Sequence, residues 1–216
     1  MRMAPEGWPF IIPGWTIVAV LAWIAATHGG WWWAPTMILG LFAVWLLVFF
    51  RDPIRSGPRG DAAIISPADG TIVGVTEVQE PSYLKASALR VSIFMSVVNV
   101  HVNRYPVSGT VEYTHYNPGK FLHAAKEKAS LDNEQSSVGL RGARGPLLVR
   151  QIAGSIARRI VTDSKPGDRV TQAERLGMIR FGSRVDVFIP AAARAKIAVR
   201  PGEHVFAGAT VLAEYP

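Results

Sequence analysis

The pair Gly182-Ser183 interrupts a regular alternation of apolar and polar residues that runs through residues 177–190. Such alternation predicts a half-buried β-strand; its apolar positions are Ile179, Phe181, Val185, Val187 and Ile189. Glycine inside a strand indicates a bulge, or a point where another group approaches the backbone closely. Because Gly154-Ser155 is a second pair of this kind, the dipeptide alone does not distinguish an ordinary bulge from a reactive serine.

A histidine that could transfer protons lies in the apolar run 97–102. His101 shares its strand parity with Asn99 and Asn103, opposite the valines. Imidazole can accept and return a proton near neutral pH, although a buried structural histidine fits the same spacing. Asp69 lies in the sequence Pro-Ala-Asp-Gly, and aspartate before glycine is common in turns without any catalytic role.

Several short motifs together resemble one family. Ser-Pro-Ala-Asp-Gly at 66–70, Asn-Val-His-Val-Asn-Arg at 99–104 and Phe-Gly-Ser-Arg-Val-Asp at 181–186 resemble phosphatidylserine decarboxylase, in particular its short bacterial subfamily. Further matching segments lie at 50–53, 119–121, 151–154 and 157–160. The resemblance therefore extends over residues 50–190.

The resemblance implies a proenzyme that cuts itself between Gly182 and Ser183. The Ser183 hydroxyl would attack the Gly182 carbonyl and convert the amide into an ester. β-Elimination and hydrolysis would then leave a pyruvoyl group at residue 183 and release ammonia. The products would be a beta chain, residues 1–182, and an alpha chain, residues 183–216.

The same resemblance implies a carboxy-lyase that converts phosphatidylserine to phosphatidylethanolamine in phospholipid biosynthesis. The pyruvoyl ketone would form a Schiff base with the serine amine of the lipid and accept electrons as carbon dioxide departs. No metal is expected, because no metal-ligand set is evident.

By resemblance, His101 is the base and acid, and Asp69 orients it and stabilises its protonated form. Longer members of the family carry a second histidine where this chain has Arg104. Either His101 serves both cleavage and decarboxylation, or another group such as His123 takes one role. Arg104, Lys120 and His123 are candidate ligands of the lipid phosphate and carboxylate, although exposed basic residues are often only solvated.

Charge is distributed unevenly along the 216 residues, whose net charge is +7. Residues 7–50 contain no Asp, Glu, Lys or Arg. The segments 11–30 and 31–50 are each long enough to cross a bilayer as a helix, and His28-Gly29-Gly30 separates them. Arginines flank the pair at both outer ends, so the positive-inside rule places both ends in the cytoplasm. A hairpin that enters only one leaflet fits as well.

A proline- and arginine-rich linker at 51–60 precedes a catalytic domain at 61–216 with a β-like pattern. Short β-branched runs predict strands at 64–65, 71–73, 91–94 and 97–102, with a further pair at 147–152 and 156–161. Residues 124–135 are the best helix candidate of this domain. Two weak internal repeats occur, 67–72 with 106–111 and 166–170 with 201–205. We therefore expect a mainly β (α+β) fold, a duplicated lipoyl-like barrel or sandwich after a helical hairpin.

The absence of cysteine excludes disulfides and thiolate nucleophiles. The basic domain and apolar leader predict anionic membrane lipid as a partner, rather than nucleic acid, and a place on the cytoplasmic side of the inner membrane. Other expected partners are phosphatidylserine and the chain's own cleaved alpha chain, and a homo-oligomer is compatible with the sequence. The alternatives are a membrane-anchored serine hydrolase using Asp69, His101 and Ser183, and a non-enzymatic, carrier-like barrel tethered to the membrane.

Overall fold

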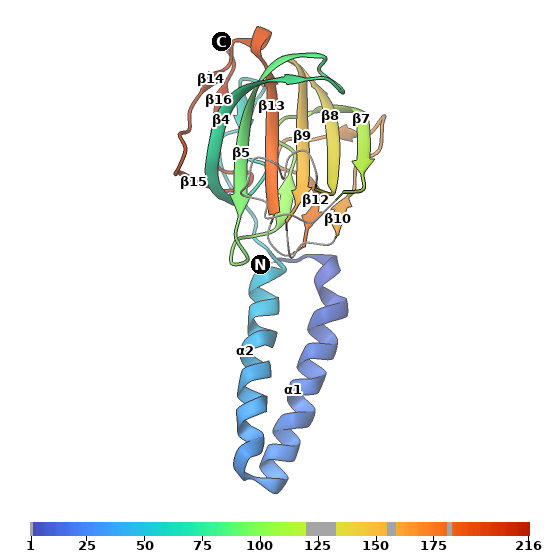
Figure 1. Ribbon diagram of the computed structural model, residues 1–216, viewed down its shortest axis with the longest axis vertical. Helices are drawn as coiled ribbons and strands as arrows, with labels where there is room; N and C mark the ends of the chain where they lie inside the picture. The colour runs from blue at the N-terminus through green and yellow to red at the C-terminus, as the bar shows by residue number, and fades with distance from the viewer. Residues whose placement is uncertain (1, 120–132, 155–158, 181–182) are drawn as a thin grey trace. The chain divides into compact units, whose positions relative to one another are not determined.

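The computed structural model describes residues 2–119, 133–154, 159–180 and 183–216. The chain forms two compact units, Met1–Ile54 and Arg55–Pro216. Figure 1 shows the helices of the first unit and the strands of the second.

The first unit is a helical hairpin whose helices lie side by side (Figure 1). Its elements are β1 (Arg2–Met3), η1 (Pro5–Gly7), α1 (Trp8–His28), η2 (Gly30–Trp32), α2 (Trp33–Phe49) and β2 (Arg51–Asp52), and β1 pairs with β2. The predicted break is confirmed, because Gly29 and Gly30 both have φ of +64°, a conformation that glycine adopts without strain. The helical segments Pro5–His28 and Gly30–Phe49 are long and apolar enough to cross a membrane, which suits membrane association.

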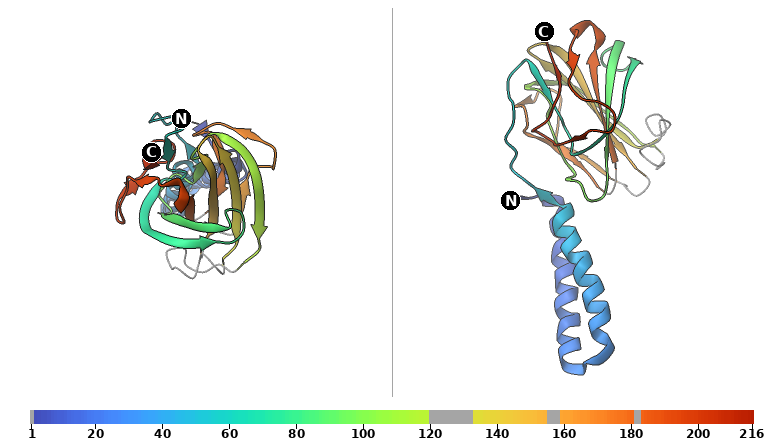
Figure 2. Two further views of the ribbon diagram at one scale, coloured as in Figure 1. Left: turned by 90° about the horizontal axis from the view of Figure 1, so that it is seen from above. Right: turned by 90° about the vertical axis from the view of Figure 1, so that its left-hand side faces the viewer.

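Nearly all regular elements that the structure describes in the second unit are strands. An eight-stranded antiparallel sheet has the order β11-β7-β8-β9-β13-β5-β4-β15, and two three-stranded sheets have the orders β10-β12-β6 and β14-β16-β3. Seen from above, the large sheet curls into a half-barrel (Figure 2). The bounds are β3 Ala63–Ile65, β4 Gly70–Glu80, β5 Ala86–Met95, β6 Val102–Arg104, β7 Gly109–Asn117, β8 Gln135–Gly142, β9 Gly145–Ala153, β10 Ile160–Thr162, β11 Arg169–Val170, β12 Arg175–Ile179, β13 Ser183–Pro190, η3 Ala191–Ala193, β14 Lys196–Ile197, β15 His204–Val205 and β16 Val211–Glu214. The mainly β prediction is confirmed.

The predicted duplication is also confirmed, and it is nested. Strands β3–β5 and β13–β16 form an outer repeat, and β6–β12 form an inserted repeat placed between β5 and β13. From its two edges inward, the large sheet has corresponding strands of the two repeats in the same order: β11, β7, β8 and β9 correspond to β15, β4, β5 and β13. In the small sheets, β10, β12 and β6 correspond to β14, β16 and β3. Equivalent backbone bonds recur: Gly202 N–H donates to the Ile72 carbonyl and Gly167 N–H to the Val111 carbonyl, both at 2.8 Å.

The stretch 177–190 is not the single interrupted strand that its alternation predicts. Residues up to Ile179 belong to β12 of a small sheet, whereas Ser183 begins β13 of the large sheet. The expectation of a half-buried strand is wrong for β13 as well, because Arg184 and Asp186 on its polar face are buried. The Arg184 Nε and Nη2 groups donate to Asp186 at 2.7 and 3.1 Å, and Nη2 donates to the Ser92 hydroxyl at 2.8 Å. Burial of this face is therefore compatible with its charges.

Three local expectations need correction. The segment 97–102 is not a strand, because β6 begins only at Val102. The strands at 147–152 and 160–162 do not pair, since β9 pairs with β8 and β13 while β10 pairs with β12. The helix expected at 124–135 falls mostly outside the described residues, and Gln135 at its predicted end begins β8 instead.

Candidate active site

Ser183 is the first residue of β13 and is fully buried. It pairs with Met95 of β5 on one side and with Ala153 of β9 on the other. Its hydroxyl donates to the Met95 sulfur at 3.3 Å. Gly182 lies outside the described residues. Ladders on both sides therefore hold residue 183 in place.

The three motifs of the sequence meet at the end of β5. The turn at 66–70 is joined to β6, because Arg104 N–H donates to the Pro67 carbonyl at 2.9 Å. The same turn leads into β4, where Thr71 pairs with Phe94. Met95, the next residue, contacts Ser183. Segments far apart in the sequence thus surround the start of β13.

His101 is fully buried beside β6. Its Nδ1 atom lies 3.0 Å from the Asn99 carbonyl oxygen. Because a carbonyl can only accept, this contact assigns the proton to Nδ1, and Nε2 is then the basic nitrogen of the neutral ring. The Asn99 side chain accepts from the Ser96 N–H and hydroxyl at 2.8 and 2.7 Å. These two hydrogen bonds therefore fix the loop whose Asn99 carbonyl binds the imidazole.

Asp69 is buried, and its two oxygens have different surroundings. Oδ1 accepts the Ala207 N–H at 2.7 Å, while Oδ2 forms an ion pair with Arg55 at 2.6 Å. In the inserted repeat, the equivalent residue Ser108 accepts the Gln172 N–H at 2.9 Å. The Oδ1 bond therefore belongs to the turn shared by both repeats. The ion pair that Oδ2 forms with Arg55 is the feature that distinguishes Asp69 from Ser108. The sequence pattern placed Arg55 only among the arginines that flank the hairpin and indicated no role for it in the site.

The three tentative ligands of substrate are only partly described. Arg104 Nη1 donates to the Ala173 carbonyl at 3.0 Å. Lys120 and His123 lie outside the described residues. A role in substrate binding stays a prediction for all three.

Two neighbours of the site received no role from the sequence. Asn103 and Gln151 are fully buried, and Gln151 Nε2 donates to Asn103 Oδ1 at 2.8 Å. Asn103 Nδ2 lies 3.7 Å from the Met95 sulfur that contacts Ser183. Signals were present, because Asn103 shares the parity of His101 and Gln151 opens a segment that resembles the family.

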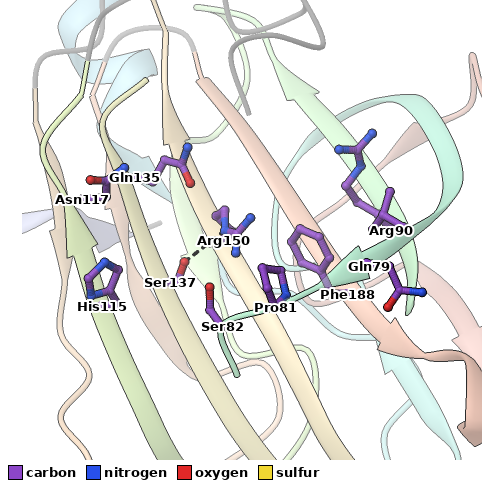
Figure 3. A pocket seen from close by; sticks show the side chains of 11 residues that line it. Gln79, Pro81, Ser82, Arg90, His115, Asn117, Gln135, Ser137, Arg150 and Phe188 are labelled. Carbon is purple, nitrogen blue, oxygen red and sulfur yellow. Dashed lines mark hydrogen bonds between the residues drawn. The ribbon is translucent and has the colours of Figure 1, made fainter. Parts of the chain in front are cut away.

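A cavity of about 450 Å³ lies on the opposite face of β13. Figure 3 shows Phe188, Arg150 and Ser137 on its wall. Phe188 and Ser183 differ by five positions, so they point to opposite faces of the strand. The Arg150 guanidinium stacks over Phe188 at 4.8 Å and pairs with buried Glu80 at 3.1 Å. Among the described residues, none of those expected to act on substrate lines this cavity.

Among the described residues, no group of three or more His, Cys, Asp or Glu side chains could hold a metal ion. A serine, a histidine and a carboxylate on adjoining buried segments are the groups that acid–base and nucleophilic chemistry requires.

Comparison with known proteins identifies the family. The family model for phosphatidylserine decarboxylase matches residues 42–213. The chain is 48% identical to a protein of Ralstonia pickettii over 98% of its length and 95% of the relative. It is 45% identical to a protein of Nitrosomonas europaea over 99% of its length and 95% of that relative. A protein of Symbiobacterium thermophilum is 44% identical over 99% of this chain and 96% of its own.

All three relatives are named phosphatidylserine decarboxylase proenzyme, and their lengths are close to that of this chain. The match spans the motifs that meet at the end of β5 and most of both repeats. The chain therefore belongs to the phosphatidylserine decarboxylase family, as one of its short bacterial members.

Proposed function

We propose that this protein decarboxylates phosphatidylserine to phosphatidylethanolamine after cutting itself between Gly182 and Ser183. Membership of the family supports the reaction, and the name proenzyme supports the cut. The single observation that carries the site is the position of Ser183, buried as the first residue of β13 between β5 and β9. Loss of the preceding peptide bond would leave the ladder bonds of β13 intact.

A pyruvoyl group at residue 183 fits these surroundings. The residue is fully buried, so bulk water would be kept from a ketone there. The short chain 183–216 would stay attached without a covalent link, because β13, β15 and β16 pair with β5, β9, β4 and β3. When present, the group supplies an electron sink for decarboxylation.

His101 is the proposed base and acid. Nε2 would take the proton of the Ser183 hydroxyl during cleavage and later return a proton to the decarboxylated carbon. Asp69 would stabilise the protonated ring, with Arg55 holding its second oxygen. Arg104, Lys120 and His123 would meet the phosphate or carboxylate of the lipid.

The apolar hairpin would keep the enzyme at its substrate. We place both ends of residues 1–50 on the cytoplasmic side of the inner membrane, followed by the linker 51–60 and the catalytic domain 61–216. The arginines that flank the hairpin support this orientation. The basic domain would be attracted to anionic lipid.

Intact mass under denaturing conditions tests the proposal. The purified protein should contain residues 1–182 and a fragment 183–216 blocked by a ketone. The Ser183→Ala variant should stay full length and convert no phosphatidylserine. A protein that decarboxylates the lipid while remaining one chain would contradict the self-cleavage.

A further inference from the structure

A chain of polar side chains begins in the core near Ser183, at the fully buried Asn103 and Gln151, and continues to the half-buried Thr162. Gln151 Nε2 donates to Asn103 Oδ1 at 2.8 Å, and the Thr162 hydroxyl donates to Gln151 Oε1 at 2.9 Å. The Ser136 hydroxyl lies 2.6 Å from that of Thr162. We call these four residues the polar relay. It connects the large sheet, through Gln151 and Ser136, with a small sheet, through Asn103 and Thr162.

The outer repeat builds the same four positions from aliphatic residues. Asn103 pairs with Gly177 in the inserted repeat, and Ile64 pairs with Ala213 in the outer repeat, so Ile64 is the equivalent of Asn103. Thr162 pairs with Gly177 as Ile197 pairs with Ala213. Gln151 pairs with Ser136 as Ile189 pairs with Leu89.

The fold itself therefore does not need polar groups at these positions. Asn103 and Gln151 are fully buried, and burying their amides costs free energy that the aliphatic residues of the outer repeat do not incur. Only the polar set lies next to Ser183, and the chemistry of that residue would explain why polar side chains are used there.

The relay fixes which way the Asn103 amide points. Because Thr162 donates to Gln151 Oε1, the Gln151 NH₂ group faces Asn103 and must meet its oxygen. The Asn103 NH₂ group is then directed to the other side, at 3.5 Å from the Pro67 carbonyl and 3.7 Å from the Met95 sulfur. Both distances are long, and a thioether is a weak acceptor. A strong donor thus points at the sulfur that the Ser183 hydroxyl contacts.

We propose that Asn103 Nδ2 donates the hydrogen bond that stabilises the oxyanion of self-cleavage, and that Gln151 and Thr162 are positioning residues for that amide. The inference rests on the self-cleavage proposed above. In this step Ser183 Oγ bonds to the carbonyl carbon attached to its own nitrogen, the carbonyl π electrons move to oxygen, and the Oγ proton passes to the base. The carbon–nitrogen bond then breaks, the nitrogen takes up a proton and an ester remains. A donor aimed at the charged oxygen lowers the barrier of this step.

The first test replaces Asn103 by the residue that the other repeat uses. The Asn103→Ile proenzyme, pulse-labelled during cell-free synthesis into lipid nanodiscs, should cleave about 10²–10³ times more slowly than wild type. Its thermal stability should fall moderately, because the buried Gln151 amide loses its acceptor, so the folded fraction of the proenzyme is measured together with the cleavage rate. The control Ile64→Val alters a buried aliphatic residue of the outer repeat and should cleave normally. Cleavage of Asn103→Ile at the wild-type rate would overturn the inference.

A second variant keeps the shape of the relay and reverses its polarity. A carboxylate at Gln151→Glu has no N–H, so Asn103 must turn its NH₂ group toward residue 151 and away from Met95. Cleavage should slow at about pH 8 and recover toward about pH 5, because a protonated Glu can again donate to Asn103 Oδ1.

The rate is taken as a ratio to wild type. Taking this ratio cancels the pH dependence that both proteins share. One source of it is His101, which lies two residues from Asn103. Another is Asp163, which follows Thr162 and pairs with Arg175 at 2.8 Å. A ratio that does not change with pH would contradict the positioning role. If the wild type itself stays one chain, the proposed function fails. If only Asn103→Ile and Gln151→Glu behave as wild type, this inference alone fails.

Discussion

Asn103 and Ile64 occupy equivalent positions in the two repeats, and Asn103 is the one that reaches the sulfur of Met95. The pair marks where one copy of a duplicated fold departs from the other. Because the inserted repeat lies between β5 and β13, Ser183 is the residue at which the chain re-enters the outer repeat. A cut before Ser183 would therefore separate segments at a natural junction and leave both repeats assembled.

The dual role of His101 predicts a large effect of one substitution and a small effect of its neighbour. His101→Ala should slow self-cleavage by about 10²–10⁴, the usual loss for a positioned base. Arg104→Ala should cleave normally and bind lipid more weakly, since arginine stays protonated and shuttles no protons. Time courses on denaturing gels measure both. Normal maturation of His101→Ala would mean that another residue, with His123 tested next, is the base.

The ion pair of Arg55 with Asp69 predicts a role for the linker in the site. Arg55→Met should lower the unfolding free energy by about 1–3 kcal/mol, because the Asp69 carboxylate is buried and loses a charged donor. It should also slow cleavage if Asp69 supports the base. Arg55 also stacks over Phe206 at 5.2 Å, so Phe206→Leu is the control that removes the ring contacts of Phe206 with Arg55 and His204 but leaves the ion pair. If both variants lose the same stability and cleave alike, the ion pair has no separate role.

Glu80 predicts a stability that depends on pH. Burial raises the pKa of its carboxyl, but bonds from the Tyr83, Leu84 and Ser82 amides and the charge of Arg150 outweigh burial and lower the pKa below 4.5. A lowered folded pKa stabilises the protein above about pH 4.5, and this contribution is lost as pH falls through the folded value. Glu80→Gln should therefore cost about 1–3 kcal/mol at neutral pH and progressively less in acid.

This difference should be measured by denaturant unfolding of the uncleaved Ser183→Ala background in detergent. Glu77→Gln is the control, since Glu77 lies on the same strand and, within the described part of the chain, accepts one side-chain hydrogen bond, from the Ser87 hydroxyl at 2.7 Å. A Glu80→Gln deficit that stays constant below about pH 4 would show that the carboxylate is not the source of the stability.

Removal of the hairpin tests the division of the chain. Deleting residues 1–50 should leave a soluble protein that still cleaves itself, because Arg55–Pro216 is a compact unit and contains the proposed site. Its turnover of phosphatidylserine in bilayers should fall more than that of a short-chain analogue in solution. Equal losses on both substrates would mean that the hairpin supports the catalytic domain rather than its access to lipid.

Short motifs were sufficient to indicate the family by resemblance, and local turn chemistry predicted the hairpin break at Gly29 and the duplication; the cut at Gly182-Ser183 stays a prediction. Each depends on residues that are neighbours in the chain or on a repeated turn, so a single sequence carries the signal. The turns at 166–170 and 201–205 do pair with equivalent strands, at Gly109 and Gly70.

Only the tertiary structure decided how these segments meet. The alternation of 177–190 could not show that β12 and β13 belong to different sheets, or that Arg184 and Asp186 would be buried. Arg55 reaches Asp69 across 14 residues, and Gln151 reaches Asn103 across 48. Periodicity shows which residues share a face, but the partner that covers the face comes from a distant segment. For this reason the polar relay becomes visible only when the strands of the inserted repeat are packed together, and its place next to Ser183 only when β13 of the outer repeat lies beside them.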